Sequence, residues 1–385
     1  MSSSSSGQQR LLSLDAFRGA TIAGMIMVNN PGSWSTIYPQ LEHASWNGWT
    51  FTDFIFPFFL WIVGVAMTLS FAKRVEQGAN KVQLMGHVFR RAIIIFALGL
   101  FLAAFPFGLL FGHQFSLTNL RIPGVLQRIA VCYLIASAIF LWSNVRGQIA
   151  WIVGLLASYW LMVMLIPVPG FGAGVVNQPT GSLCWWIDST VLAGHTWRGA
   201  PVPGFDPEGI VSTIPAIATT LLGVLTGHWL RTSRSPEEKT VWMFVAGEFL
   251  MLLGAIFDMW LPINKNMWTS SYVIFMAGWA LVIFAMFYWL IDVKGYKKWA
   301  LPFTIYGMNA ITVFVLSGLI AKTLGLIKVA AADGTMISLQ HLIYTSVFVP
   351  IASPLNASLL FAICFIGVMF LVVWGMWKLK WFVKI

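Results

Sequence analysis

Apolar residues run along this chain in stretches of about 20, separated by short polar segments. An α-helix of roughly 20 apolar residues crosses a bilayer core of ~30 Å, so each stretch predicts one membrane-spanning helix. We predict ten such helices, at residues 13–30, 52–71, 92–111, 123–142, 149–167, 209–230, 241–261, 269–291, 300–321 and 355–377. The predicted fold class is all-α, a polytopic membrane helix bundle that forms a single domain over residues 1–385.

The composition fits a membrane protein, because 58% of the residues are hydrophobic and 9% are charged, whereas a soluble domain has roughly 25% charged residues. Residues 1–10, MSSSSSGQQR, predict a disordered tail. The run after them carries Asp15 and Arg18 and has no small-residue cleavage site, which favours a retained first span over a signal peptide. Three scattered cysteines, Cys132, Cys184 and Cys364, indicate neither a disulfide framework nor a metal site.

The net charge of +10 reflects orientation in the membrane rather than binding to nucleic acid. With the N-terminus in the cytoplasm, sixteen of the 23 Lys and Arg residues lie on the cytoplasmic side, five lie outside and two lie within spans. Basic residues concentrate on the cytoplasmic side of membrane proteins, so we expect both termini there. This requires an even number of spans, and segment 338–354 is therefore expected to be re-entrant or interfacial on the outer side.

A polar segment, VNNPGSWSTIYPQLEHASWNGWTFTDF at 28–54, joins the first two spans on the outer side. It contains His43, and histidine is the residue type whose side chain ordinarily changes charge near neutral pH. Such a side chain can take a proton from an attacking amine or hydroxyl, or can itself carry an acyl group. An ordinary surface histidine is the alternative, and the chemistry alone leaves both open.

Several polar side chains lie where a membrane bundle has few. Asp15 and Arg18 share one helix face, and Asn29 lies three turns further along that face. Ionisable residues within spans mark function by default, although an Asp–Arg pair that fixes helix packing is the alternative. Arg121 and Arg128 are seven residues apart, and paired guanidinium groups suit a phosphorylated ligand.

Partner carboxylates for these two arginines, such as Glu248 or Asp258, are the alternative to a phosphate. Lys265 either meets a phosphate or marks a turn. Segment 168–208 is rich in Gly and Pro and is expected to form an ordered periplasmic cap. Asp206 and Glu208 end this segment just before a predicted helix, where acidic side chains also act as simple caps.

No P-loop, GxGxxG or HExxH pattern occurs, so nucleotide hydrolysis and metal chemistry have no support. Seven stretches read together resemble heparan-α-glucosaminide N-acetyltransferase and its bacterial relatives, a family of transmembrane acyltransferases. They are SLDAFRG (13–19), VNNPG (28–32), HASWNGWTFTDFIFPFFLWIVG (43–64), LRIPGVLQRIA (120–130), DPEGI (206–210), PINKNMW (262–268) and YGMNAITVF (306–314).

The resemblance implies that an acetyl group passes from cytosolic acetyl-CoA to the amine of a glucosamine-type sugar on the periplasmic side. It implies that His43 is the catalytic residue and that Asn29 assists it. On this basis we expect Arg18, Arg121, Arg128 and Lys265 to hold acetyl-CoA, and Asp188, Asp206, Glu208 and Trp46 to contact the sugar. The other expectations are a multi-pass protein of the bacterial inner membrane and a homodimer. O-acetylation of an envelope glycan and transport of a sugar or ion remain as alternatives.

Overall fold

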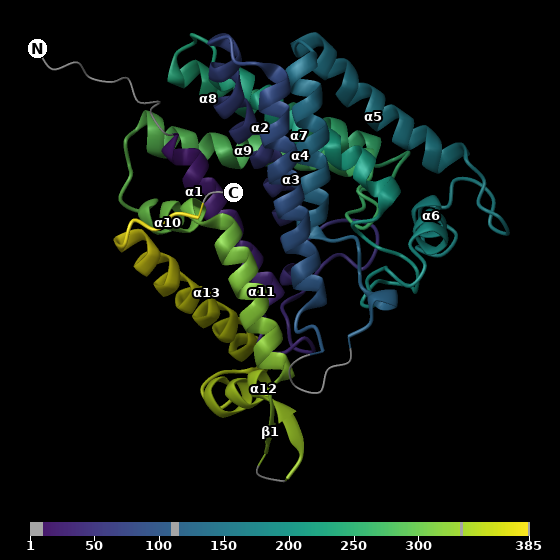
Figure 1. The fold of residues 1–385 in the computed structure, drawn as a ribbon, viewed down its shortest axis with the longest axis vertical. Coiled ribbons are helices and arrows are strands. Elements are labelled where there is room, and N and C mark those ends of the chain that lie inside the picture. Colours follow the sequence, from purple (N-terminus) through teal and green to yellow (C-terminus); the bar gives the residue numbers. More distant parts are fainter. Residues whose placement is uncertain (1–10, 109–114, 332–333, 384–385) are drawn as a thin grey trace, which may run out of the picture.

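The computed structural model describes residues 11–108, 115–331 and 334–383 (Figure 1). The predicted disordered tail, 1–10, lies outside the described residues. The helices are α1 (Leu12–Asn29), α2 (Thr52–Glu76), α3 (Lys81–Ala104), α4 (Val125–Trp142), α5 (Val145–Leu165), α6 (Leu183–Val191), α7 (Ile210–Leu230), α8 (Pro236–Phe257), α9 (Ser270–Tyr288), α10 (Leu301–Met308), α11 (Ala310–Leu326), α12 (Leu339–Ile343) and α13 (Pro354–Lys378). Strands β1 (Lys328–Ala330) and β2 (Met336–Ser338) form an antiparallel hairpin.

Eight helices in the described part of the chain are long and apolar enough to cross a membrane: α2, α3, α4, α5, α7, α8, α9 with its continuation to Val293, and α13. The first predicted span corresponds to α1, whose hydropathy is lowered by its polar residues. The predicted span 300–321 is a bent pair, because α10 and α11 meet at 82°. The all-α membrane bundle is therefore confirmed, and one of its spans is broken.

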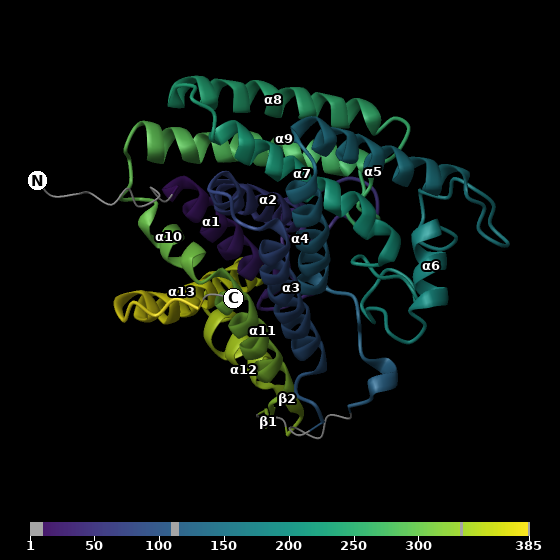
Figure 2. The ribbon, with the colours of Figure 1, turned by 45° about the horizontal axis from the view of Figure 1, so that its top comes forward.

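The close packing of α1 against α10 depends on two glycines. A Cβ atom on Gly19 would lie 1.7 Å from the carbonyl oxygen of Phe303, and one on Gly307 would lie 2.0 Å from that of Asp15. The two backbones thus approach more closely than any larger residue allows, as is common between membrane helices. This contact fixes the bent pair against the first helix, with α13 on its other side (Figures 1 and 2).

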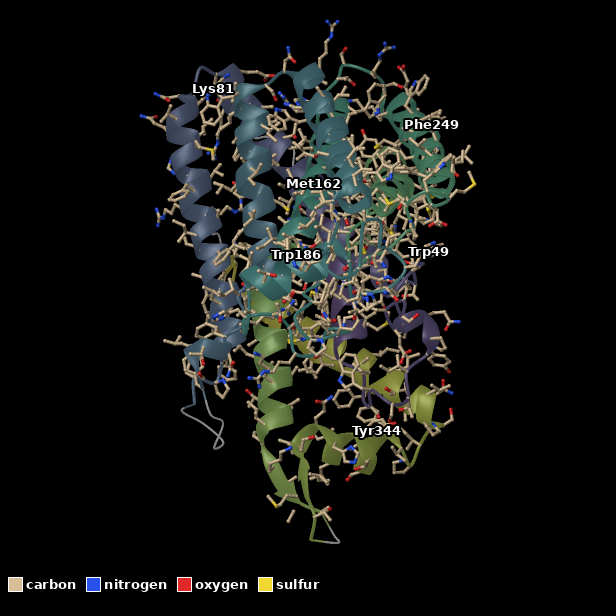
Figure 3. The ribbon with its side chains drawn as sticks, turned by 90° about the vertical axis from the view of Figure 1, so that its right-hand side faces the viewer. Trp49, Lys81, Met162, Trp186, Phe249 and Tyr344 are labelled. Atoms are coloured by element: carbon tan, nitrogen blue, oxygen red, sulfur yellow. The ribbon has the colours of Figure 1, made fainter. Side chains whose placement is uncertain are left out.

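The connections that the predicted topology places on the outer side meet at one end of the bundle, which is called the outer end below. Gly48 forms a parallel β-bridge with Asn264, and Ile122 donates its backbone N–H to His195 at 3.0 Å. Gly32 likewise donates to Ser358 at the start of α13. Figure 3 shows Trp49 and Trp186 at a similar level, far from Lys81 at the opposite end of α3.

The predicted re-entrant or interfacial segment, 338–354, folds as α12 followed by a π-helical turn, Tyr344–Phe348. Its Gln340 side chain donates to the carbonyl of Pro31 at 3.1 Å, and Tyr344 lies 3.3 Å from the hydroxyl of Thr36. The segment therefore packs on the same connection that carries His43. Which end of the bundle faces the cytoplasm stays a prediction.

Candidate active site

His43 and Asp53 form a hydrogen-bonded pair at the start of α2. The Nδ1 atom of His43 lies 2.6 Å from Oδ1 of Asp53. The side chain of His43 is 46% exposed, whereas that of Asp53 is 1% exposed. A buried carboxylate on Nδ1 selects the tautomer that carries its proton there and leaves a lone pair on Nε2. The accessible nitrogen of His43 is thereby prepared to act as a base or a nucleophile.

Asp53 is held in place by the beginning of its own helix. Its Oδ2 atom accepts the backbone N–H of Thr50 at 2.9 Å and that of Ala44 at 3.1 Å. A carboxylate three residues after a threonine that accepts the threonine N–H is one half of a capping box. The Tyr272 hydroxyl donates to the backbone carbonyl of Asp53 at 2.6 Å. The lone pairs of Oδ2 are therefore occupied, and the orientation of the carboxylate is fixed.

The rest of the HASWNG stretch joins the connection between α1 and α2, which carries His43, to two other connections by hydrogen bonds. Trp46 is buried and donates its indole N–H to the carbonyl of Val176 at 3.0 Å. Asn47 donates to Asn177 at 2.9 Å and accepts from Asn264 at 3.1 Å. Trp46, predicted as a sugar contact, therefore lies inside the structure with its donor already used.

Asn29, the predicted assistant of His43, is the last residue of α1 and is exposed. Its neighbour Asn30 is the buried member of the pair and donates to Ile26 at 2.8 Å. Within the described ranges, no hydrogen bond joins the Asn29 side chain to His43. The amide of Asn29 is thus available to a ligand at the outer end of α1.

The first helix carries the predicted ion pair. Arg18 lies 3.2 Å from Asp15 and also donates to the carbonyl of Gly307 at 3.2 Å. Because Gly307 belongs to α10, Arg18 joins the two closely packed helices. The pair has the packing role that was the alternative to ligand binding, and its guanidinium also reaches a cavity described below.

The other predicted site residues form one charged network at the outer end. Arg121 binds Asp206 through two hydrogen bonds of 2.8 and 2.7 Å and contacts Glu208 at 2.5 Å. Lys265 lies 3.8 Å from Glu208. Burial alone would raise the pKa of Glu208, but Lys265 and Arg121 hold it well below its ordinary value. The carboxylate partners of Arg121 are therefore Asp206 and Glu208.

The two acidic residues offered as alternative partners lie elsewhere. Glu248 is exposed on α8, the helix on which Figure 3 labels Phe249. Asp258 accepts the backbone N–H of Ile263 at 2.6 Å. Burial would lower the pKa of Arg121, but hydrogen bonds to Asp206 and the charge of Glu208 raise it above its ordinary value. Arg121 is thus a permanently charged, paired side chain.

Arg128 lies beneath this network and is almost fully buried. It donates to the carbonyl of Gly209 at 3.3 Å and to the Ser212 hydroxyl, and its guanidinium lies 5.1 Å from the ring centroid of Trp268. In the part of the chain that the structure describes, its Nε and Nη1 atoms have no hydrogen-bond partner. Arg128 therefore packs the start of α4 against that of α7.

Asp188 connects α6 to the start of α7. It accepts the backbone N–H of Ile210 at 3.0 Å and that of Asp206 at 3.4 Å. A Cβ atom on Gly209 would lie 1.9 Å from its carboxylate, so only glycine fits there. Burial, with a further contribution from the charge of Asp206, raises the pKa of Asp188 to about 7. Its carboxylate acts as a cap for α7.

A cavity of about 460 Å³ lies among α1, α2, α3, α4, α10 and α11. Its basic lining residues are Arg18 and Arg91, and Arg91 also lies 5.3 Å from the ring centroid of Tyr133. Arg121, Arg128 and Lys265 do not line it. The cavity is mostly apolar and carries two guanidinium groups on its wall, which suits a long ligand with anionic groups.

Helix α2 connects the cavity with the histidine pair. The cavity is lined by α2 residues from Phe59 to Phe71, whereas Asp53 lies near the outer end of the same helix. At 1.5 Å per residue, the lining covers ~18 Å of α2 and begins ~9 Å from Asp53. A ligand that fills the cavity and extends along α2 would therefore approach the end of that helix at which Asp53 holds His43.

Comparisons with known proteins fit this geometry. The family model described as heparan-alpha-glucosaminide N-acetyltransferase, catalytic, matches residues 10–255. The chain is 30% identical over 354 residues to the heparan-alpha-glucosaminide N-acetyltransferase of Homo sapiens and 29% identical over 358 residues to that of Mus musculus. Each match covers 80% of this chain, and 52% and 53% of the two relatives. The chain spans about half the length of these curated relatives.

Proposed function

The chain belongs to the heparan-alpha-glucosaminide N-acetyltransferase catalytic family, and on this premise we propose that it transfers an acetyl group from acetyl-CoA to the amine of a glucosamine-type sugar. The observation that carries the proposal is the exposed imidazole of His43, oriented by the buried Asp53 at 2.6 Å. It lies at the outer end of the helix that lines the cavity. The geometry suits transfer across the membrane from one reactant to another.

The imidazole of His43 acts in one of two ways. As a general base, Nε2 takes a proton from the sugar amine while the amine nitrogen attacks the thioester carbon. As a nucleophile, Nε2 attacks that carbon first, releases the CoA thiolate and then passes the acetyl group to the amine. In both, a C–N bond replaces the C–S bond, and the proton lost by the amine ends on the CoA thiol. Asp53 stabilises the charge that develops on the imidazole ring.

Asn29 is proposed to donate a hydrogen bond to the thioester oxygen while negative charge develops there. Its exposed amide has no partner among the described residues, so binding a ligand costs no protein hydrogen bond. An amide donor of this kind lowers the barrier by about 3 kcal/mol. Asn29 lies at the end of α1, whose other end carries Arg18 on the cavity wall.

The donor is proposed to occupy the cavity, with its phosphates near Arg18 and Arg91. Guanidinium groups bind phosphate oxygens through paired N–H donors. Arg91, absent from the predicted site, joins Arg18 in this role because it lines the same cavity. Arg121 and Lys265 are instead assigned to the network that holds the outer connections together.

The acceptor is proposed to bind on the exposed side of His43, outside the bundle. Asn47 lies four residues after His43 and donates a hydrogen bond to Asn177 at 2.9 Å. Both asparagines are exposed. Their amides are suitable partners for sugar hydroxyl groups. The periplasmic side, the bacterial inner membrane and a homodimer remain predictions that accompany this proposal.

The test uses purified protein in detergent with acetyl-CoA and glucosamine. The proposal predicts consumption of acetyl-CoA that depends on glucosamine, with N-acetylglucosamine as the product detected by mass spectrometry. The variant His43→Ala should lose at least about 10²-fold in rate, the usual contribution of a general base. A folded His43→Ala protein with the normal rate contradicts the assignment. A glucosamine whose amine is blocked should be inert; acetylation of its hydroxyl groups would show O-acetylation instead.

Transport of a sugar or ion is the second candidate, and the broken span favours it. Many transporters bind their substrate where a membrane helix is interrupted, and α10 and α11 bend by 82° beside the cavity. A transporter would leave acetyl-CoA intact and would require sealed vesicles for any activity. Turnover in detergent therefore separates the two functions.

A further inference from the structure

The C-terminal end of the chain folds back onto the bundle. α13 ends at Lys378, and Lys380 has a left-handed backbone conformation with φ of +55°. Trp381 then donates its N–H to Met376 at 2.8 Å and Lys380 to Trp377 at 3.0 Å. This pair of bonds is a Schellman motif, which reverses the chain at a helix end. Residues 379–383, here named the C-terminal strap, return along α10 toward the middle of the molecule (Figure 1).

The strap is held by one buried side chain at the break between α10 and α11. Asn309 is 2% exposed. Its Nδ2 donates to the carbonyl of Trp381 at 3.4 Å, and its Oδ1 accepts the backbone N–H of Val383 at 3.2 Å. Both halves of the amide are therefore used on the strap. The residue that ends α10 is also the residue that fixes the chain end.

The strap forms part of the wall of the donor cavity. Val383 lines that cavity together with Met308, Ala310 and Ile311, which flank Asn309 on both sides. Arg18, Val383 and the residues on both sides of the break thus line one cavity. Pockets for drug-sized ligands measure roughly 300–1,000 Å³, and acetyl-CoA is larger than most drugs. The cavity measures about 460 Å³, in the lower part of that range, so displacing part of its wall would enlarge the space for such a ligand.

The left-handed backbone conformation at Lys380 raises the free energy of the closed strap. A non-glycine residue costs roughly 1–2 kcal/mol in this conformation. Among the described residues, the strap is held by the Schellman bonds, the two bonds to Asn309 and the bond from Leu379 to Gly375, and Trp381 and Val383 are exposed. Few buried contacts therefore oppose release, whereas α10 and α11 are anchored by α1 and α13. The strap is the part of the cavity wall that is easiest to displace.

We propose that the C-terminal strap is a gate on the donor cavity and that Asn309 is its latch. Breaking the two bonds to Asn309 opens the cavity, and the nucleotide part of the donor then lies where the strap lay. The identity of the ligand rests on the proposed function, whereas the gate itself does not.

The test measures access to the cavity without any acetyl transfer. Ala66 lines the cavity, so Ala66→Cys, in a protein whose exposed Cys364 is replaced by serine, reports entry of a water-soluble maleimide. Val383→Pro removes the N–H that Asn309 accepts, and Val383→Ala keeps it as the matched control. The labelling rate should rise roughly fivefold in Val383→Pro, the factor expected for one neutral hydrogen bond, and should rise less in Val383→Ala, which shortens one wall side chain but keeps the bond to Asn309.

A second variant, Asn309→Ala, removes the latch from the other side and should raise the labelling rate in the same direction. Equal rates in Val383→Pro and Val383→Ala, whether raised or not, would overturn the latch. Turnover of acetyl-CoA is measured separately on the same proteins. A protein that shows the labelling effect but never consumes acetyl-CoA retains the gate and contradicts the proposed function.

Discussion

The variant Asp53→Asn isolates the orienting role of the carboxylate with almost no change in shape. The amide oxygen of asparagine can still accept the N–H groups of Thr50 and Ala44, which Asp53 accepts at 2.9 and 3.1 Å. Its NH₂ group then faces Nδ1 of His43 at the position where Oδ1 now lies, 2.6 Å away. An N–H donor at that position favours the tautomer with the proton on Nε2. The exposed nitrogen would lose its lone pair.

The magnitude follows from this change of tautomer. An aspartate-to-asparagine change behind a catalytic histidine lowers kcat by about 10⁴-fold in the serine proteases, for the same reason. His43 is partly exposed and can rotate, so we expect a loss of about 10³-fold in kcat here, ~4 kcal/mol in the barrier. The KM for acetyl-CoA should stay within a factor of about three, because Asp53 does not line the cavity.

The assay is single-turnover acetyl transfer by the purified variants, with thermal unfolding measured in parallel. Glu42→Gln is the matched control, because its carboxylate is exposed and its backbone carbonyl alone accepts from Thr50. That control should keep the normal rate. A folded Asp53→Asn protein with kcat within threefold of the unchanged protein would refute the orienting role, and an equal loss in Glu42→Gln would show that the assay reports local charge only.

Three further variants test separate parts of the structure. Arg91→Ala should raise the KM for acetyl-CoA about tenfold, since it removes charged hydrogen bonds to phosphate, while Arg90→Ala, at a neighbouring residue that does not line the cavity, leaves KM unchanged. Arg121→Gln should lower the free energy of unfolding by about 3 kcal/mol, because Glu208 loses its closest cation; an altered donor KM with normal stability would contradict its structural role. The pKa of the Asp188 carboxyl group is raised from 3.8 to about 7, so between these pH values the folded state keeps a proton that the unfolded state has released. This protonation stabilises the folded state at low pH, and the stabilisation is lost as pH rises through the interval. Thermal unfolding should show that decline, and Asp188→Asn should remove it.

The apolar runs were sufficient to predict the bundle, because bilayer thickness fixes helix length whatever the neighbours are. The pairing of Asp15 with Arg18 was also predictable, since a spacing of three places both on one helix face. The break at Asn309 was not, because no proline or glycine marks position 309 and the run from 300 to 321 reads as one span. There the packing of Gly19 against Phe303 decides the path of the chain.

The partners within the site were harder to predict than the site itself. His43 and Asp53 are ten residues apart across a non-helical connection, so no helical period links them. The Thr50 to Asp53 capping-box spacing was the available signal for where the carboxylate points. Arg121 and Asp206 are 85 residues apart in sequence, and only the folded connection 166–209 brings them together. Arg91 was counted among the topogenic charges, and its place on the cavity wall depends on how α3 is rotated.

The most direct test of transfer across the membrane uses sealed proteoliposomes with acetyl-CoA on one side and glucosamine on the other. Because Asp53 holds His43 at one end of α2, beyond the part of the helix that lines the cavity, the unchanged protein should form N-acetylglucosamine in the glucosamine compartment, and His43→Ala should form none. Product that forms only when both reactants share one compartment, or at an equal rate with His43→Ala, would contradict the account.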